Sequence, residues 1–455
     1  MPDANPARAT AREAIALLTG AAGFTEHRPP PSPLPPDGPL GWAGYDAARE
    51  RASARTGEEE SVVYGTGVVG DRPCVLLSFE FGFLGGSLGR QTGDRLAAAY
   101  ELALTRRLPL LALVATGGSR MQEGMVALTQ LQRVAAASVR LRAAGLPQIA
   151  VVRDPTTGGG WATVGAGADV VLALPGAQVG FAGSRVRPPD ADPYAYSAEG
   201  QFGAGQVDAV VPADELTATV THWLRALGPH EDLPAAPVPR ALSVADSGRV
   251  APLPETGREA VARARDPRRP RAEAYLADYF AVRLPLHGDR SGSTDPGLLC
   301  GFGLRGEGQP VAYVAQCGTP TRPAGYRAAA RTIRLADRLG VPVLTLVDTP
   351  GAANDAEAER AGAGAAIADA FAAVAAARVP VTTLVIGEGG SGGALALAAP
   401  DNTHVTVDSY FSVIAPELAA AILKRPPSET GATADQLRLR PQDLVDLGFA
   451  RSIVG

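Results

Sequence analysis

The sequence predicts an α/β protein in which one supersecondary plan is used twice. Residues 379–399, VPVTTLVIGEGGSGGALALAA, read as a buried β-strand, a glycine-rich turn and a helix of small residues. Residues 145–183 contain the same parts in the same order, and the two segments align without a gap. The strands before them, within 108–118 and 341–351, align in the same register. Because strands alternate with helices in both halves, we expect two domains, each built on a largely parallel sheet.

Length and composition indicate a soluble globular protein. The 455 residues suffice for two domains, 46% of them are apolar, and the net charge of −5 argues against a nucleic-acid-binding protein. The dispersed cysteines Cys74, Cys300 and Cys317 are typical of a reducing compartment and predict neither a disulfide framework nor a zinc site. No signal peptide or membrane-spanning stretch is evident, so we expect a cytoplasmic enzyme without a membrane partner.

Proline- and arginine-rich stretches predict where the domains begin and end. HRPPPSPLPPDGP is too rich in proline to join a core, and PHEDLPAAPVPR and ARARDPRRPR read as connecting chain. The basic cluster at residues 263–271 lacks interleaved aromatic residues, which favours a solvated linker over a nucleic-acid patch. We therefore expect a flexible tail at 1–40, a first domain at 41–227, a linker at 228–270 and a second domain at 271–455.

Local patterns predict the individual elements. In the first half, Gly70 and Asp71 separate two β-branched runs and are typical of a hairpin turn. The expected elements there are helices at 11–18, 46–55, 122–144 and one ending at 104, and strands at 61–69, 73–79 and 108–116. The expected elements of the second half are helices at 272–282, 325–339, 361–377, 419–423 and 441–447, and strands at 297–304, 310–317, 381–386, 405–413 and one leading into Asp348.

The glycine-rich turns are the candidate functional sites. Glycines at a strand-to-helix turn let backbone N–H groups converge on a negative oxygen, and the helix N-terminus adds the positive end of its dipole. No Lys-Ser/Thr pair follows the glycines, which excludes a Walker P-loop. The alternative is a turn that only permits close packing of helix on strand. Because the glycine-rich turn recurs in both halves, the functional interpretation is favoured over this alternative.

Side chains suited to acid–base or nucleophilic chemistry are few. The histidines lie mostly in the tail, the linker or helix ends, and none has a metal-ligand spacing; they are His27, His222, His230, His287 and His404. Ser391 in GEGGSGG faintly resembles a serine nucleophile, but the aligned residue of the first half is Gly158. Both halves keep backbone donors, which points to stabilisation of an oxyanion such as a thioester enolate.

Short motifs in both halves are shared with a known enzyme family. FEFGFLGGSLG, ATGGSRMQEG, DPTTGG and GFAGSRV in the first half resemble the β subunit of bacterial acetyl-CoA carboxylase carboxyltransferase. GDR, AGYRAAAR, TPGA, IGEGGSGGALA and YFSVIAPE in the second half resemble its α subunit. The resemblance implies two tandem crotonase-type spiral domains of repeated ββα units. It also implies transfer of a carboxyl group from carboxybiotin to the α-carbon of an acyl-CoA of the acetyl- or propionyl-CoA class.

The resemblance also assigns roles to the glycines. The positions implied as catalytic are Gly117, Gly118, Gly158 and Gly159 for the thioester oxygen, and Gly392 and Gly393 for the ureido oxygen of biotin. The positions implied as binding the acyl-CoA or biotin are Gly85, Gly86, Arg120, Gly351, Gly389 and Gly390. Biotin would itself be the base, so no histidine is required.

Partners are implied by the same resemblance. The sequence has no Met-Lys-Met biotin-attachment motif and no ATP-binding module, so biotin is expected on a separate carrier protein, charged by a biotin carboxylase. In the family the first domain of one protomer faces the second domain of another, which implies at least a homodimer. The four-cysteine zinc ribbon of the family's β subunit is replaced by the proline-rich tail, so no zinc is expected.

Two departures from the family pattern concern the pockets. Trp161 follows the first-half glycines where the family has a small residue, and we expect it to reshape the acyl pocket. After TPGA, Ala353, Asn354 and residues 361–363 interrupt the family's run on the biotin side. These changes keep three alternatives open: a malonyl-thioester decarboxylase, a biotin-independent acyl carboxyltransferase, and a non-catalytic assembly subunit. The intact glycine pairs argue against the last.

Overall fold

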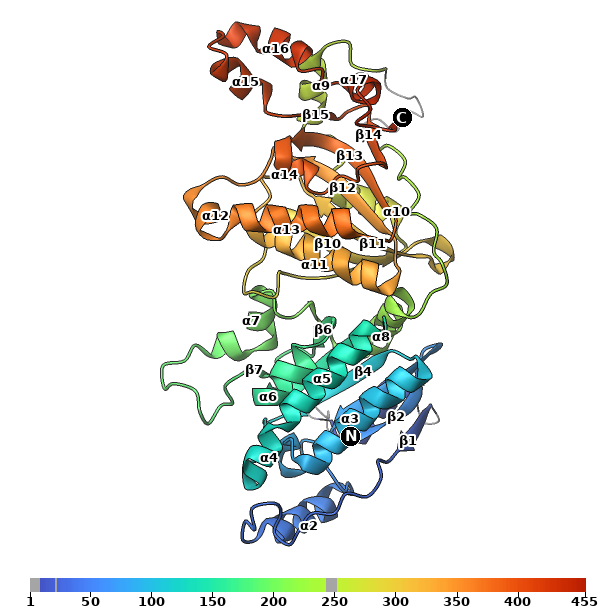
Figure 1. The fold of residues 1–455 in the computed structure, drawn as a ribbon, viewed down its shortest axis with the longest axis vertical. Coiled ribbons are helices and arrows are strands. Elements are labelled where there is room, and N and C mark those ends of the chain that lie inside the picture. Colours follow the sequence, from blue (N-terminus) through green and yellow to red (C-terminus); the bar gives the residue numbers. More distant parts are fainter. Residues whose placement is uncertain (1–8, 21–22, 243–251) are drawn as a thin grey trace. The chain divides into compact units, whose positions relative to one another are not determined.

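The computed structural model describes residues 9–20, 23–242 and 252–455. These residues form two compact units (Figure 1). The first unit extends to residue 229 and includes 290–292, and the second comprises 230–289 and 293–455. In the part of the chain that is described, each unit contains one eight-stranded sheet.

The first sheet has the order β1-β2-β3-β4-β5-β6-β8, with β7 beside β5. Its strands are β1 (Phe24–His27), β2 (Val62–Val69), β3 (Arg72–Phe79), β4 (Leu110–Thr116), β5 (Gln148–Thr157), β6 (Val170–Ala173), β7 (Val179–Gly180) and β8 (Ala209–Val210). The first three strands are antiparallel, and pairing from β3 onward is parallel. Every residue of β4 is buried, as expected for a strand covered on both faces.

Helices α3 (Arg90–Arg106) and α5 (Gln130–Ala143) pack together over this sheet and supply much of its core. The remaining helices of the first unit are α1 (Ala11–Thr19), α2 (Tyr45–Thr56), η2 (Leu84–Gly86), η3 (Met121–Glu123), α4 (Gly124–Leu128), α6 (Gly158–Gly160), η4 (Trp161–Gly165), η5 (Pro193–Tyr196), α7 (Ala198–Gly203) and α8 (Ala213–Leu227).

The second sheet has the order β16-β14-β13-β12-β11-β10-β9, with β15 beside β13. Its strands are β9 (Val282–Pro285), β10 (Leu298–Leu304), β11 (Pro310–Gln316), β12 (Val343–Thr349), β13 (Val381–Gly390), β14 (Thr403–Thr406), β15 (Tyr410–Ser412) and β16 (Ser452–Val454). The helices are α9 (Gly257–Ala264), α10 (Ala272–Tyr279), η6 (Gly306–Gly308), α11 (Pro323–Leu339), α12 (Ala356–Arg360), α13 (Ala363–Ala376), α14 (Ser391–Leu395), α15 (Pro416–Ile422), η7 (Pro427–Glu429), α16 (Thr430–Gln436) and α17 (Pro441–Asp446).

The predicted duplication extends to the hydrogen-bond register. The pairing of β4 with β5 shifts between Val114 and Thr116, and the pairing of β12 with β13 shifts between Val347 and Thr349. Both residues of the second irregularity lie 233 positions after their counterparts in the first. A bulge bends a strand and redirects the residues beyond it, so both units turn their chain at the same place.

The N-terminal segment is more ordered than a flexible tail. The predicted helix is confirmed as α1, and it buries Ala11, Ile15 and Leu18. Strand β1 pairs with β2. Residues 9–20 and 23–27 therefore pack with the first unit, whereas a flexible tail was expected up to residue 40.

The expected linker also contains structure. Within 228–270, helix α9 contributes Ala260, Val261 and Ala264 to a small core with Tyr410 and other residues of the second unit. Arg269, expected to be solvated, is only 4% exposed. The eight residues of α9 are too few for a clear hydrophobic periodicity, and the surrounding proline and arginine residues are typical of a linker.

Three expected elements end differently. The helix from Ala272 ends at Tyr279, because the chain turns there into β9. Two strands, β14 and β15, replace the single strand at 405–413. The helix expected at 122–144 is broken at Thr129 into α4 and α5.

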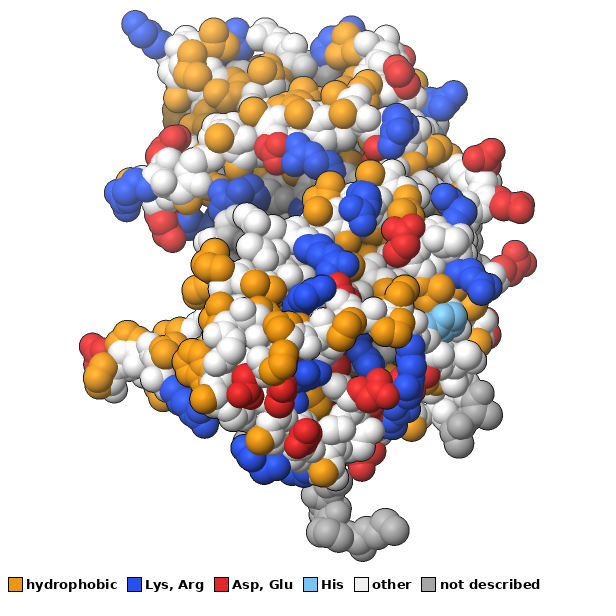
Figure 2. All heavy atoms as spheres, turned by 60° about the horizontal axis from the view of Figure 1, so that its bottom comes forward, with side chains coloured by type: hydrophobic (Ala, Val, Ile, Leu, Met, Phe, Trp, Pro, Cys, Tyr) orange, Lys and Arg blue, Asp and Glu red, His pale blue; other side chains and the backbone are white. Residues whose placement is uncertain are grey.

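The surface shows no large area of one charge on the face seen in Figure 2, where arginine and acidic side chains alternate. Among the described residues, no helix combines the length and apolar character needed to cross a bilayer.

Candidate functional site

Two turns meet at the carboxyl ends of β4 and β5 in the first unit. Gly118, after β4, has a φ angle of 103°, and Gly158, at the start of α6, has one of 64°. A Cβ atom on Gly158 would lie 2.9 Å from the Cα atom of Gly118. Glycine is favoured at both positions because the backbone is left-handed there and the two chains touch.

The other predicted glycines of the first half lie at the same corner. The N–H of Gly117 donates to the carbonyl of Gly85 over 2.9 Å. A Cβ atom on Gly86 would lie 2.2 Å from the carbonyl oxygen of Ala115. The structure thus brings together Gly85, Gly86, Gly117, Gly118, Gly158 and Gly159.

Several of these glycines already use their N–H groups within the protein. The N–H of Gly158 donates to the carbonyl of the residue after β7, and that of Gly118 donates to Thr116 Oγ1 over 3.0 Å. The first-turn N–H groups of a helix have no acceptor inside the helix. The donors left at the start of α6 are therefore those of Gly159 and Gly160, while Gly118 and Gly158 shape the turn.

The second unit repeats this corner at the ends of β12 and β13. Gly351 has a φ angle of 138°, and Ser391, at the position that aligns with Gly158, has one of 57°. A Cβ atom on Gly390 would lie 2.1 Å from the carbonyl oxygen of Pro350. The left-handed turn and its close backbone contact are therefore kept, although a serine stands where the first half has glycine.

The remaining second-half glycines divide by environment. Gly392 is exposed, and no atom lies within 4 Å of the place where its Cβ would stand. Gly393 is buried, with its Cβ position 2.4 Å from the nitrogen of Ala352. Gly389 lies against the ring of Phe411, at 2.1 Å from its Cβ position, so it serves the packing of β13 on β15. The open space over Gly392 suits the approach of a ligand.

Both corners are braced by the same backbone hydrogen bonds. In the first unit, Leu88 donates to the carbonyl of Gly118 over 2.8 Å and accepts from the N–H of Arg120 over 2.9 Å. In the second unit, Thr321 donates to Gly351 over 3.1 Å and accepts from Ala353 over 2.9 Å. All three residues of the second set lie 233 positions after their counterparts. The loop before each long helix therefore fixes the turn that faces the glycines.

Arg120 does not face a ligand, contrary to the expectation that it binds substrate. It is 1% exposed, and its guanidinium contacts Glu60 Oε1 at 2.5 Å and Glu123 Oε1 at 3.4 Å. It also donates to Tyr45 Oη, which in turn donates to Glu123 over 2.5 Å. The arginine anchors the turn to α2 from within the protein.

This ion pair shifts the pKa of its members. Burial alone would raise the pKa of Glu60, but the adjacent Arg120 guanidinium outweighs burial and holds it below its ordinary value of 4.5. Burial would lower the pKa of Arg120, and the Glu60 carboxylate raises it instead. Both groups therefore stay charged at neutral pH.

A different buried ion pair, which the sequence patterns did not predict, supports the corner of the second unit. Asp348, fully buried at the end of β12, contacts Arg269 at 2.5 Å and Arg271 at 3.1 Å. It also accepts from the N–H of Glu388 over 3.2 Å. A Cβ atom on Gly387 would lie 2.2 Å from Arg269 Nη2, so glycine leaves room for the pair. The acidic residue before TPGA could have indicated a buried charge. Its partners were harder to find, because Arg269 lies in the expected linker and Arg271 directly follows it.

Two further polar residues of the second unit contact the glycine turn. Tyr326 Oη donates to the carbonyl of Gly393 over 3.0 Å, and Gln316 Nε2 donates to the same carbonyl over 3.3 Å. Gln316 Oε1 is buried and has no hydrogen-bond partner in the part of the chain that is described. An unpaired buried acceptor costs about 1–3 kcal/mol. Tyr326 lies in the motif AGYRAAAR, whose resemblance to the family implied no role for the tyrosine.

Trp161 does not project into a pocket as expected. Its side chain is 7% exposed and lies in the core of the first unit. A Cβ atom on Gly165 would lie 2.6 Å from the indole ring, so this glycine makes room for it. The π-helical turn η4 (Trp161–Gly165) accommodates the larger side chain without changing the glycines.

The altered run after TPGA folds into a short helix. Asp355 caps α12 by accepting from the N–H groups of Glu357 and Ala358. Ala353, Ala358 and Ala363 pack together as a small buried cluster. The substitutions on this side therefore support a compact helical turn beside Gly351.

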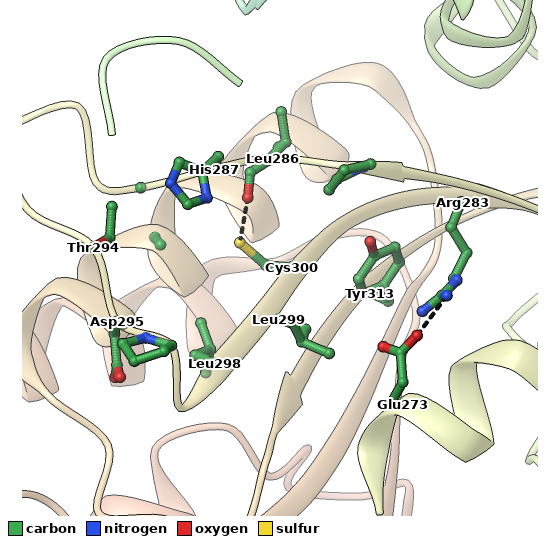
Figure 3. Close-up of a pocket in the computed structure, with 15 residues that line it drawn as sticks. Glu273, Arg283, Leu286, His287, Thr294, Asp295, Leu298, Leu299, Cys300 and Tyr313 are labelled. Carbon is green, nitrogen blue, oxygen red and sulfur yellow. Dashed lines mark hydrogen bonds and ion pairs between the residues drawn. The ribbon is translucent and has the colours of Figure 1, made fainter. Parts of the chain in front are cut away.

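A cavity of about 450 Å³ lies in the second unit at the edge of β10 (Figure 3). Asp295 on its wall accepts from the N–H of Arg322, the N-cap of α11, over 2.8 Å. Burial raises the pKa of Asp295 above its ordinary value. Through this cap the cavity borders the helix that carries Tyr326. Among the described residues, no three His, Cys, Asp or Glu side chains gather as a metal site.

Comparison with known families supports the resemblance of the second half. Residues 253–455 match the family described as acetyl co-enzyme A carboxylase carboxyltransferase-like. The whole chain is similar to the acetyl-coenzyme A carboxylase carboxyl transferase subunits beta/alpha of Saccharopolyspora erythraea, with 38% identity over 95% of this chain and 75% of that protein. It is 34% identical to the probable biotin-dependent acyl-coenzyme A carboxylase beta3 subunit of Mycobacterium bovis, over 90% of this chain and 82% of that one.

Solved structures show the same fold. The hexameric transcarboxylase 12S with methylmalonyl-coenzyme A and methylmalonic acid bound superimposes with a TM-score of 0.76 at 22% identity, over 99% of this chain and 87% of that one. A single-chain, multi-domain long-chain acyl-CoA carboxylase gives a TM-score of 0.75 at 21% identity, over 98% of this chain and 44% of that one. The expected pair of crotonase-type domains is confirmed.

Proposed function

Because this chain belongs to the family of acetyl-CoA carboxylase carboxyltransferases with fused β-like and α-like halves, we propose that it moves a carboxyl group from carboxybiotin to the α-carbon of an acyl-CoA. The observation that carries the proposal is the repeated glycine turn. In each unit two neighbouring strands end in the same register, and a short helix begins there. The first N–H groups of this helix have no acceptor inside it.

The first unit is assigned to the acyl-CoA. When the α-carbon loses its proton, the thioester oxygen becomes negative, and preorganised N–H donors stabilise that charge by about 3 kcal/mol each. Gly159 and Gly160 supply these donors, and Gly118 with Gly158 holds the turn in shape. Gly85, Gly86 and Gly117 keep the neighbouring loop close to this corner. Arg120 supports the corner from the buried side.

The second unit is assigned to biotin. Carboxybiotin, when bound, supplies the carboxyl group and the base that takes the α-proton. Gly392 leaves open space where the ureido ring would lie, and the first-turn N–H groups of Gly392 and Gly393 would donate to the ureido oxygen. Gly351 and Gly390 bring the adjoining backbone close enough to close the turn. No histidine of the chain is needed for the proton transfer.

The reaction also determines the partners. We propose that biotin arrives on a carrier protein, is carboxylated by a separate biotin carboxylase, and that the chain works in the cytoplasm as a homodimer or larger assembly. The acyl group is proposed to be short, of the acetyl- or propionyl-CoA class.

The test is mass-spectrometric turnover of malonyl-CoA and methylmalonyl-CoA by the purified protein, with and without free biotin. We expect loss of CO₂ only when biotin is present, and abolition by Gly159→Val, because the Cβ position of Gly159 already lies 2.5 Å from Leu131. Gly306→Ala is the control, since its Cβ would have no neighbour within 4 Å. Biotin-independent loss of CO₂ would identify a decarboxylase, and full activity of Gly159→Val would remove the proposed hole.

A further inference from the structure

The carbonyl of Gly393 is held by two side chains that the proposed chemistry does not use. Tyr326 Oη donates to it over 3.0 Å and Gln316 Nε2 donates over 3.3 Å. Tyr326 is 1% exposed and Gln316 is fully buried. Burial raises the pKa of Tyr326 above its ordinary value of 10, so its hydroxyl remains a donor at neutral and moderately alkaline pH.

The same side chains connect this carbonyl to the facing loop. Gln316 Nε2 also donates to Thr321 Oγ1 over 3.1 Å. The backbone of Thr321 is in turn bonded to Gly351 and Ala353. One buried polar cluster therefore ties together the two chain segments that form the second glycine corner.

With this cluster in place, both carbonyls of the glycine pair are fixed. The carbonyl of Gly392 accepts from the N–H of Ala396 over 3.0 Å, and that of Gly393 accepts from the two side chains. Because a peptide unit is planar, fixing a carbonyl also fixes the N–H of the following residue. Holding the Gly392 carbonyl fixes the N–H of Gly393, and holding the Gly393 carbonyl fixes the next peptide unit, so Gly393 is held on both sides within the turn that carries the proposed donors Gly392 and Gly393.

The fold alone does not require these side chains. By strand pairing, Gln316 at the end of β11 corresponds to Phe79 at the end of β3, and Tyr326 aligns with Gly93. The Cβ position of Gly160, which corresponds to Gly393, is enclosed by the side chains of Thr116 and Leu88. The first unit thus forms the same turn with side-chain packing around Gly160. The polar pair of Tyr326 and Gln316 is therefore specific to the second unit. Gln316 Oε1, on the same side chain, is buried without a hydrogen-bond partner among the described residues.

We propose that Tyr326 and Gln316 are positioning residues that orient the donors of the second glycine turn toward the ureido oxygen of biotin. The inference rests on the function proposed above and deepens it. Preorganised donors stabilise a developing charge without reorganising during the reaction. Loss of either side chain loosens the Gly393–Ala394 peptide unit and with it the turn that carries the donors, so the effect falls on the rate of the biotin-dependent step and not on binding of the acyl-CoA to the first unit.

The test compares Tyr326→Phe and Gln316→Leu with the wild type in biotin-dependent decarboxylation of malonyl-CoA. We expect kcat to fall about tenfold for each variant, because an indirect support is worth less than a donor itself, while KM for malonyl-CoA stays within about twofold. The double variant should fall by less than the product of the single effects, because both side chains hold one carbonyl.

Tyr100→Phe is the matched control. Tyr100 is a buried tyrosine, 3% exposed, in α3 of the first unit, and its hydroxyl interacts with Ser138 and not with a glycine turn. It should keep the wild-type kcat. Thermal unfolding of each variant confirms that the protein compared is folded.

Three outcomes decide between the ideas. A tenfold lower kcat with unchanged KM in Tyr326→Phe or Gln316→Leu, but not in Tyr100→Phe, supports the inference. The inference alone is overturned if both variants turn over substrate as fast as the wild type, or if a rise in KM accounts for the whole loss of activity. A wild-type protein with no biotin-dependent turnover overturns the proposed function, and the inference falls with it.

Discussion

The backbone follows the same path at both glycine corners, but a different buried ion pair supports it in each unit. In the first unit the brace is Arg120, which lies within the turn itself and is paired with Glu60. The aligned residue of the second unit is Ala353. There the brace is Asp348 at the strand end, paired with Arg269, and the aligned residue of the first unit is Ala115. Each unit therefore has alanine where the other has its buried charge.

The difference teaches which part of a duplicated site is constrained. The strand register, the bulge and the backbone bonds of the turn are the same in both units, because they place the N–H donors. The buried ion pairs only have to hold that backbone, and two solutions at different positions do so. Function is thus expected to be sensitive to the glycines in both units, whereas stability depends on a different pair in each.

The largest effect that would test this comparison is loss of a brace. Arg120→Met leaves two buried carboxylates, Glu60 and Glu123, without their cation, and we expect the free energy of unfolding to fall by about 3–5 kcal/mol. Arg269→Met should cost about half as much, because Asp348 keeps Arg271 at 3.1 Å. Urea unfolding of both variants measures the difference. Equal losses would contradict the assigned pairing.

A smaller effect is expected at the left-handed position of the turn. Gly158→Ala should lower turnover about 100-fold, because its Cβ would lie 2.9 Å from the Cα of Gly118 at a positive φ angle. The matched change Ser391→Gly puts glycine into the same conformation and should leave the free energy of unfolding within about 1 kcal/mol of the wild type. Steady-state kinetics and urea unfolding provide the measurements. An active Gly158→Ala variant would show that the contact can relax.

The smallest effect concerns acid. The pKa of Glu60 lies below its ordinary value of 4.5 in the folded protein, so below about pH 4.5 the unfolded chain binds a proton that the folded protein does not. Stability contributed by this group is therefore present above that pH and is lost as the pH falls through the folded pKa. Its contribution to the slope is at most about 1.4 kcal/mol per pH unit. Unfolding measured between pH 6 and 3 should give a shallower slope for Glu60→Gln, and an unchanged slope would exclude this carboxylate.

The sequence alone predicted the elements and the clustering of glycines well. The two ungapped copies of one motif put these glycines after neighbouring strands, and the structure brings Gly118 to Gly158 and Gly351 to Gly390, because strands of a repeated α/β plan end at the same edge. Local patterns were sufficient for α2, the β2–β3 hairpin and α11, whose hydrophobic periodicity spans several turns.

Burial and long-range pairing could not be predicted in the same way. Arg120 lies in a motif that resembles a binding sequence. Only the structure shows that its guanidinium forms a buried ion pair with Glu60, sixty positions away. Arg269 lies in a stretch whose composition is that of a linker, although its partner is a core aspartate. The indole of Trp161 turns inward because Gly165 leaves room for it.

The outermost strands of both sheets carry a consequence for solubility. Of the described strands at these edges, β8 has two residues, β16 three, and β1 and β9 four each. In β1, Glu26 is paired with Arg12, and β9 ends at Pro285. Short, charged or proline-terminated strands offer little open backbone to a neighbouring chain. The sheets are thereby protected against edge-to-edge aggregation, and removal of residues 9–27 would expose the eight-residue strand β2 in their place.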